Sequence, residues 1–98
     1  MTTQELKELD TWIDLNLFSM KTRFPLRYTT DPACAMNVLK KCSRGARIGI
    51  DIDPLSGMFG VFTLPNQSGT EIGIVSLEST LELAICQFAK QLFSKEDK

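Results

Sequence analysis

Apolar residues recur three or four positions apart over residues 3–18, and this spacing predicts an amphipathic helix. Thr2 and Glu5 stand at its start in the spacing of a capping box, in which each residue accepts a hydrogen bond from the backbone of the other. The expected buried stripe of this helix consists of Leu6, Leu9, Ile13 and Leu17.

Two further segments have the same period. The second helix is expected to begin at Pro32, where Asp31 can accept hydrogen bonds from the first turn, and to end before Gly45. Its expected buried stripe consists of Ala35, Met36, Leu39 and Cys42.

The third helix is expected to follow a capping box of Ser79 and Glu82. Its wide apolar face consists of Leu81, Ala84, Ile85, Phe88, Leu92 and Phe93.

Three strands are expected between the second and third helices. The segments are residues 46–53, 58–64 and 70–76. The first alternates strictly, so that Ile48, Ile50 and Ile52 share one face, which we expect to be buried. The connections between the strands are only four and five residues long. They imply antiparallel pairing, because a parallel crossover needs about a dozen residues or more.

These elements predict a single domain over residues 1–98, of the α+β class, in the order α-α-β-β-β-α with a three-stranded antiparallel meander. The isoleucine face needs cover from helices. Apolar candidates are also present for the opposite side of the sheet: Met58, Phe62, Leu64 and Val75. We therefore expect helices on both faces, which makes the fold a small α-β-α sandwich.

The composition is that of a globular protein, 43% hydrophobic and 23% charged. No apolar run approaches the roughly 18 residues that span a bilayer, and the polar, acidic N-terminal segment is unlike a signal peptide. Three cysteines, an odd number, argue against a disulfide framework. We therefore expect a cytoplasmic protein with reduced thiols that does not bind membranes.

Charge is distributed unevenly, although the net charge is only −1. Residues 21–47 carry seven basic side chains against one aspartate, a net charge of +6, between two acidic ends. The candidate anion-binding residues in this basic middle are Arg27, Lys40, Lys41, Arg44 and Arg47. They could bind a phosphate, a nucleotide or an acidic protein surface, or they could complement the dipole at the end of the second helix. The slightly negative total charge argues against binding to duplex nucleic acid.

The chain offers little to catalysis. It has no histidine, so a Cys–His nucleophile pair is impossible within one chain. Cys34 and Cys42 stand about 12 Å apart along one predicted helix, too far for a disulfide, and we expect all the cysteines to pack as small apolar side chains. Asp51 and Asp53 could hold Mg²⁺ or act as acid and base, or they could lead into the turn at Pro54.

Each predicted strand also contains one interior glycine: Gly49, Gly60 and Gly73. If the register aligns these glycines, they form a shallow track that a ligand or another backbone can approach closely. The alternative is that they mark bulges or the packing of helices.

Three stretches together resemble a known family: TTQELKELDTWI, YTTDPACAMNVLKK and LESTLELAICQFAKQLF. They are similar to the small phage and prophage proteins that carry the phage ABA sandwich domain. The resemblance extends over nearly the whole chain, and it implies an α-β-α sandwich and a phage gene product that acts inside a bacterial cell. It implies no activity and no functional residue, because the members of this family are chiefly uncharacterised.

These observations predict a non-catalytic binding protein, encoded by a phage or prophage, that counteracts a host factor or defence system in the host cytoplasm. Its partner would be a host protein or an anionic small molecule such as a signalling nucleotide, and we expect no cofactor and no metal. A chain this small has little room for an enclosing pocket, which favours a homo-oligomer. Two alternatives stay open: a metal-dependent nucleotide hydrolase that uses Asp51 and Asp53, and a structural or regulatory phage protein.

Overall fold

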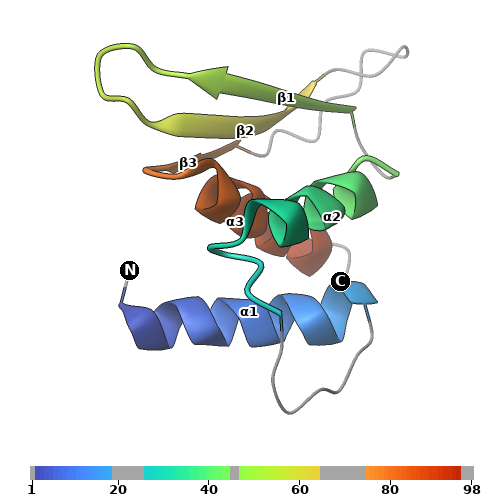
Figure 1. Cartoon of the computed structure of the whole chain (residues 1–98). Helices are drawn as coiled ribbons and strands as arrows, with labels where there is room; N and C mark the ends of the chain where they lie inside the picture. The colour runs from blue at the N-terminus through green and yellow to red at the C-terminus, as the bar shows by residue number, and fades with distance from the viewer. Residues whose placement is uncertain (1, 19–25, 45–46, 65–74, 96–98) are drawn as a thin grey trace.

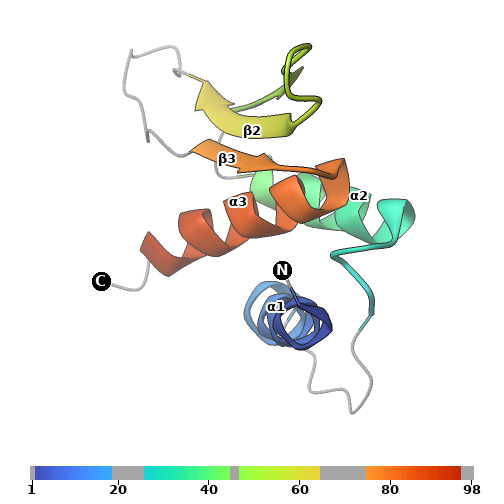
Figure 2. The same cartoon turned by 90° about the vertical axis from the view of Figure 1, so that its left-hand side faces the viewer.

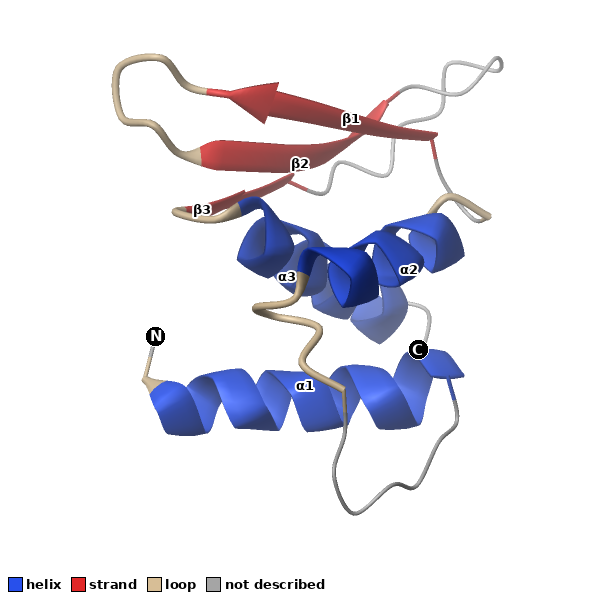
Figure 3. Ribbon diagram, viewed as in Figure 1, coloured by secondary structure: helices blue, strands red, loops and turns tan. Residues whose placement is uncertain are grey.

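A computed structural model of the chain describes residues 2–18, 26–44, 47–64 and 75–95 (Figure 1). Within these residues, the helices are Thr3–Phe18 (α1), Pro32–Cys42 (α2) and Leu81–Lys95 (α3). The strands are Arg47–Ile52 (β1), Phe59–Leu64 (β2) and Val75–Glu78 (β3). The α+β class and the order α-α-β-β-β-α are therefore confirmed (Figure 3). No helix in the described part of the chain is long and apolar enough to cross a membrane.

The starts of α1 and α2 form as expected. In α1, the Glu5 N–H donates to Thr2 Oγ1 at 3.1 Å, and the Thr2 N–H donates to Glu5 Oε1 at 3.2 Å. In α2, Asp31 Oδ1 accepts a hydrogen bond from the Ala33 N–H at 2.9 Å. These bonds satisfy backbone donors that have no partner inside the helix. The predicted stop at Gly45 lies outside the described residues.

The start of α3 differs from the prediction by one residue. The Leu83 N–H donates to Thr80 Oγ1 at 3.3 Å, and the Ala84 N–H donates to the Thr80 carbonyl oxygen at 3.0 Å. Thr80 is therefore the N-cap, where Ser79 was expected. An N-cap residue needs a side-chain oxygen that can accept a hydrogen bond from the N–H two or three residues later. Both Ser79 and Thr80 carry a hydroxyl group that meets this requirement. The sequence alone does not distinguish the two positions.

The elements stack in three layers, with α2 and α3 lying between the sheet and α1 (Figures 1 and 2). α3 contacts α1, α2, β2 and β3. Within the described residues, no helix covers the outer face of the sheet (Figure 2). The layer order is thus β-α-α, whereas the sequence had predicted helices on both faces of the sheet.

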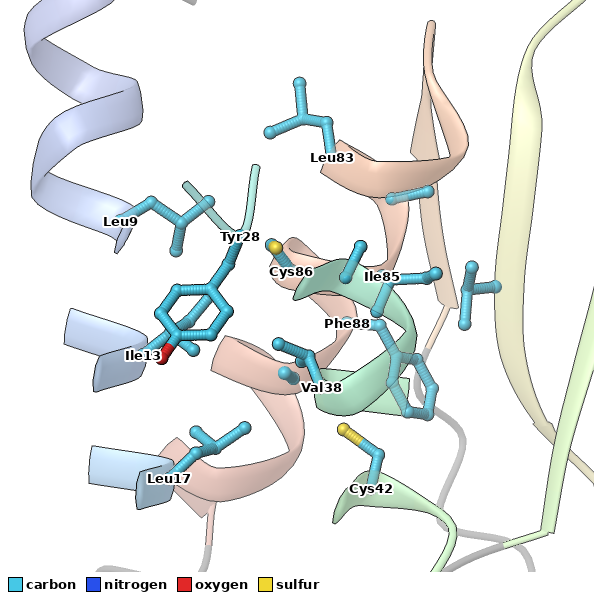
Figure 4. Packing of buried hydrophobic residues seen from close by; sticks show 14 of the residues in the cluster. Leu9, Ile13, Leu17, Tyr28, Val38, Cys42, Leu83, Ile85, Cys86 and Phe88 are labelled. Atoms are coloured by element: carbon cyan, nitrogen blue, oxygen red, sulfur yellow. The ribbon is translucent and has the colours of Figure 1, made fainter. Parts of the chain in front are cut away.

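α3 explains this layer order because it is buried on two sides. Ile85 and Phe88 lie toward the sheet and Cys86 lies toward α1, and all three are at most 1% exposed (Figure 4). The buried stripe of α1, by contrast, is narrow and consists of Leu9, Ile13 and Leu17. A helix that is apolar on two sides needs cover on both. α1 supplies the second cover, and so it does not reach the far face of the sheet.

The buried side of α2 is rotated slightly from the predicted stripe. Val38 is fully buried, whereas Met36 is 44% exposed. Ala35, Val38 and Cys42 stand at the spacing i, i+3 and i+7, which is a single helical face. The inclusion of Met36 in the core was therefore wrong.

The sheet has the order β1-β2-β3 and is antiparallel throughout. Ile50 pairs with Val61, which in turn pairs with Ser76, so these three side chains share the inner face toward α3. α3 packs chiefly on β2 and β3, and β1 is the edge farther from it. Ile50 and Ile52 are consequently 45% and 56% exposed, and only Ile48 packs against the core. The prediction that the whole isoleucine face is buried was wrong.

Candidate functional site

The five predicted basic residues do not form one group. Arg27 lies before α2, where its carbonyl oxygen accepts a hydrogen bond from the Asp31 N–H at 2.9 Å. Lys40 and Lys41 lie in the last turn of α2, at the other end of a helix of 11 residues, or about 16 Å. Arg44 follows the end of α2, and Arg47 is the first residue of β1. The structure therefore places four of the residues around this junction and separates Arg27 from them.

An open groove of about 430 Å³ lies at the junction of α2 and β1. Its lining residues are Leu39, Ser43, Arg47, Ile48, Ile50 and Leu64. Arg47 is thus the only one of the predicted basic residues that lines the groove. Lys40 and Lys41 occupy the last turn of α2, where positive charge stabilises the negative end of the helix dipole. That same dipole disfavours an anion here, which weakens the case for an anion site.

A second cleft of about 400 Å³ lies between α1 and the start of α3. Its lining residues are Leu6, Thr29, Thr30, Ser79, Thr80, Glu82 and Leu83. This lining contains hydroxyl groups and one carboxylate but no basic side chain, so it does not suit an anionic ligand.

The outer face of the sheet is apolar where β2 and β3 form it. Residues that pair directly share a face, and the register places Phe62 opposite Val75 and Leu77 opposite Gly60 on the outer face. Val75 and Leu77 are 57% and 58% exposed, and Leu64 is 36% exposed. We call these four side chains, Phe62, Leu64, Val75 and Leu77, the outer patch. Among the described residues of the sheet, the charged side chains of this face are those of Arg47 and Asp51, and both lie on β1.

The glycines of the sheet do not form an open track. A Cβ on Gly49 would lie 2.6 Å from Cζ of Phe62, and a Cβ on Gly60 would lie 3.2 Å from Cδ2 of Leu77. Each glycine therefore makes room for a side chain of its partner strand, and that side chain covers it. Gly73 lies outside the described residues.

The carboxylates of Asp51 and Asp53 are both engaged by the β1–β2 hairpin. Asp53 accepts from the Leu55 N–H at 3.0 Å and from the Ser56 hydroxyl at 2.8 Å, and these bonds lower the pKa of Asp53 below its ordinary value of 3.8. Asp51 accepts from the Ile52 N–H at 2.8 Å. In the part of the chain that the structure describes, no group of three His, Cys, Asp or Glu residues could hold a metal ion. The geometry gives both aspartates a role in the hairpin.

All three thiols are disfavoured as nucleophiles. Burial raises the pKa of Cys42 to about 12 and also raises the pKa of Cys86. Cys34 is only partly buried, but burial and then the charge of Asp31 raise its pKa as well. Because the thiolate is the reactive form, this environment supports the packing role that the sequence had suggested.

Two buried carboxylates on α1 escaped the sequence analysis. Asp10 and Asp14 are 7% and 2% exposed. The Tyr28 hydroxyl donates to Asp14 Oδ1 at 2.8 Å, and the Thr29 N–H donates to Asp10 Oδ1 at 2.8 Å. The Tyr28 ring also stacks on Phe18, with centroids 5.4 Å apart. These contacts, which we call the α1 clamp, hold the segment before α2 against α1.

One signal for the α1 clamp was present in the sequence. Asp10 and Asp14 stand at i and i+4 beside the buried Ile13, so both face the same neighbour. A buried carboxylate needs a hydrogen-bond donor or a positive charge from another segment to compensate its burial. The spacing indicates such a donor but does not identify it.

Replacing Asp10 with asparagine is expected to stabilise the protein increasingly as the pH rises above 3.8. Desolvation raises the pKa of Asp10 above that ordinary value, despite the opposing hydrogen bonds from Thr29 and the charge of Arg27. The folded state therefore binds the Asp10 proton more tightly than the unfolded chain does, and at low pH this tighter binding stabilises the wild-type fold. The wild-type protein loses that stabilisation as the pH rises through the pKa of Asp10 in the folded state. Asp10→Asn keeps the acceptor for the Thr29 N–H without the charge.

Urea unfolding followed by Trp12 fluorescence, from below pH 3.8 to neutrality, measures this difference. The variant minus wild-type free energy of unfolding should rise with pH and then level off. Glu5→Gln is the control. Its variant minus wild-type free energy of unfolding should fall as the pH rises, because the hydrogen bonds with Thr2 lower the pKa of Glu5. A difference for Asp10→Asn that does not vary with pH would contradict the prediction.

Comparison of the chain with protein-family models, with characterised proteins and with solved structures gives no match. The outer patch and the groove at the α2–β1 junction are therefore the two surfaces on which a function is proposed.

Proposed function

We propose that the protein is a non-catalytic binding protein, encoded by a phage or prophage, that binds a host protein through its outer patch and so counteracts a host factor in the bacterial cytoplasm. The observation that carries the proposal is the exposure of Val75 and Leu77, each more than half accessible, on a sheet face that no described helix covers. Contiguous exposed apolar side chains on a small protein are typical of an interaction site.

The outer patch is also held in place before any partner arrives. Phe62 packs over Gly49 and Leu77 packs over Gly60, so one side of each side chain rests on the backbone of the neighbouring strand. Ordering a side chain in advance reduces the entropy lost on binding. The patch is therefore suited to a partner with an apolar surface of its own.

Two further observations support a role in binding. The chain has no histidine, and the carboxylates of Asp51 and Asp53 accept hydrogen bonds within the hairpin. The raised thiol pKa values leave the cysteines protonated near neutral pH. The phage setting rests on the resemblance of the three sequence stretches to the ABA sandwich family.

Leu77→Asp is expected to weaken binding to the host protein by about 30-fold or more, the effect of losing one residue central to an interface. The partner would first be recovered with tagged protein from bacterial cells and identified by mass spectrometry. Calorimetry with both purified proteins would then compare wild type, Leu77→Asp and a control, Leu15→Asp. Leu15 is 48% exposed on α1, on the opposite side of the molecule from the outer patch. Circular dichroism would show that each variant is folded.

A second candidate ligand is an anionic small molecule, for which Arg47 in the groove is the specific observation. If binding survives Leu77→Asp but is lost in Arg44→Glu with Arg47→Glu, the ligand is bound at the junction of α2 and β1. A ligand whose affinity is unchanged by either set of substitutions would rule out both sites.

A further inference from the structure

The free edge of β1 has backbone groups that point away from the sheet. In the described residues β1 has one neighbouring strand, β2. The Asp53 N–H donates to the Met58 carbonyl oxygen at 2.9 Å, so these two residues are a hydrogen-bonded pair at the end of the β1–β2 ladder. Because bonded and non-bonded pairs alternate in an antiparallel ladder, the backbone groups of Arg47, Gly49 and Asp51 face β2. The backbone groups of Ile48, Ile50 and Ile52 therefore face outward.

The sequence of this edge is complementary to itself when it is reversed. Around Gly49, the chain reads Arg47, Ile48, Gly49, Ile50, Asp51. If a second copy is placed antiparallel with its Gly49 opposite the first, each Ile48 lies opposite an Ile50, and each Arg47 lies opposite an Asp51. Opposite residues share a face, so apolar side chains meet apolar ones and each cation meets an anion.

The hydrogen-bond phase agrees with the same register. Ile48 and Ile50, whose backbone groups face outward, become the bonded pairs between the copies. Arg47 and Asp51 become the non-bonded pair, in which side chains lie closest. Gly49 lies on the axis, where the absence of a side chain avoids a clash between the copies.

The existing contacts of the edge residues are compatible with this arrangement. The Ile52 N–H already donates to Asp51 Oδ1, and the register leaves that bond intact. The second oxygen of Asp51 remains available to a guanidinium group. Arg47 also has an interaction within its own chain, and its five N–H donors allow a second partner. Ile50, now 45% exposed, would be covered by the Ile48 of the second copy.

We propose that two copies of this chain form a dimer by antiparallel pairing of their β1 edges, with a two-fold axis at Gly49 and reciprocal pairs between Arg47 and Asp51. The result is a continuous sheet of six strands. The axis is perpendicular to the sheet, so both outer patches lie on the same side of it. The dimer goes beyond the function proposed above and does not depend on it.

The proposal is tested with the full chain by sedimentation velocity and by light scattering across a range of concentrations. As the concentration rises, the measured mass of the wild-type protein should increase from 11.0 kDa to twice that value. The dissociation constant should be in the micromolar range, as expected of a small interface. A wild-type protein that stays monomeric at millimolar concentration overturns the proposal. This result would also be found if the edge of β1 paired with a strand of a host protein and not with a second copy.

Charge reversal tests the register itself. Arg47→Asp and Asp51→Arg should each weaken self-association by at least about tenfold, because each places like charges opposite one another twice in the dimer. A mixture of the two variants restores both ion pairs, so heterodimers should form at the wild-type concentration. Dimers that are unaffected by the single changes, or a mixture that stays monomeric, would overturn the register.

Ile50→Pro provides a test that does not involve charge. It removes an N–H that faces outward, so the ladder between β1 and β2 keeps its bonds, and proline is tolerated at such edge positions. We expect a folded monomer, with the fold checked by circular dichroism. If Ile50→Pro fails to fold, the charge-reversal pair decides the question, and a folded Ile50→Pro dimer overturns the proposal.

Discussion

Replacing Ile13 with alanine is expected to lower the free energy of unfolding by about 2–5 kcal/mol. Ile13 is fully buried, on the narrow stripe by which α1 packs against the other two helices. The substitution removes apolar atoms and leaves a cavity that the neighbouring helices can fill only in part. A domain of this size has about 5–15 kcal/mol of total stability, so the loss would be a large fraction of it.

Leu15→Ala is the matched control, because Leu15 lies on the same helix and is 48% exposed. Its effect should stay within about 0.5 kcal/mol, as for other surface substitutions. Urea unfolding, read from the fluorescence of Trp12, measures both variants under the same conditions. Similar effects of the two substitutions would show that α1 does not dock on α2 and α3 through this stripe, and the layer order would have to be revised.

Replacing Tyr28 with alanine is expected to cost about 3–5 kcal/mol, as for the truncation of other buried aromatic residues. Tyr28 is 2% exposed, stacks on Phe18 and donates its hydroxyl to Asp14. Its loss removes a buried ring and leaves the carboxylate of Asp14 without one of its donors. The segment before α2 would then be held to α1 mainly by the bond from Thr29 to Asp10.

Tyr28→Phe separates the hydroxyl from the ring. It keeps the stacking on Phe18 and removes only the donor to Asp14, so we expect a cost of about 1–3 kcal/mol, the cost of leaving a buried acceptor unsatisfied. Leu26→Ala is the control, since Leu26 lies in the same segment and is 52% exposed. If Tyr28→Phe is as stable as wild type, the hydrogen bond does not contribute to holding the α1 clamp together.

The position of the stabilising contacts makes the functional proposals testable. The buried cluster lies between the inner face of the sheet and α1 (Figure 4). The outer patch lies on the opposite face of the sheet, and the free edge of β1 lies at the border of the sheet. Substitutions at Leu77, Arg47 or Asp51 therefore remove few buried contacts. We expect such variants to change binding or assembly while the fold remains intact.

The candidate site was only partly predictable from the sequence. Local spacing placed Lys40, Lys41 and Arg44 together, because they are close along one helix and its exit. The expected start of this helix at Pro32 also placed Arg27 at its other end. Spacing could not show that Arg47 is the only one of the five basic residues that lines the groove. The α1 clamp was missed because its donors, from Tyr28 and Thr29, come from a different segment, 14 and 19 residues along the chain from their acceptors.

Local sequence determined the helices, the first two strands and the order of the elements, because hydrophobic period, capping residues and turn residues act over a few positions. The third strand was expected at residues 70–76, whereas β3 is described as Val75–Glu78 and residues 70–74 lie outside the described residues. It also determined the antiparallel meander, since short connections leave no alternative. Only the tertiary structure decided the layers. α3 is apolar on two sides and needs two covers, so α1 packs on the helices and no described helix covers the outer face of the sheet. Periodicity shows that a face is apolar, but which neighbour covers it depends on how all the apolar faces can be buried together.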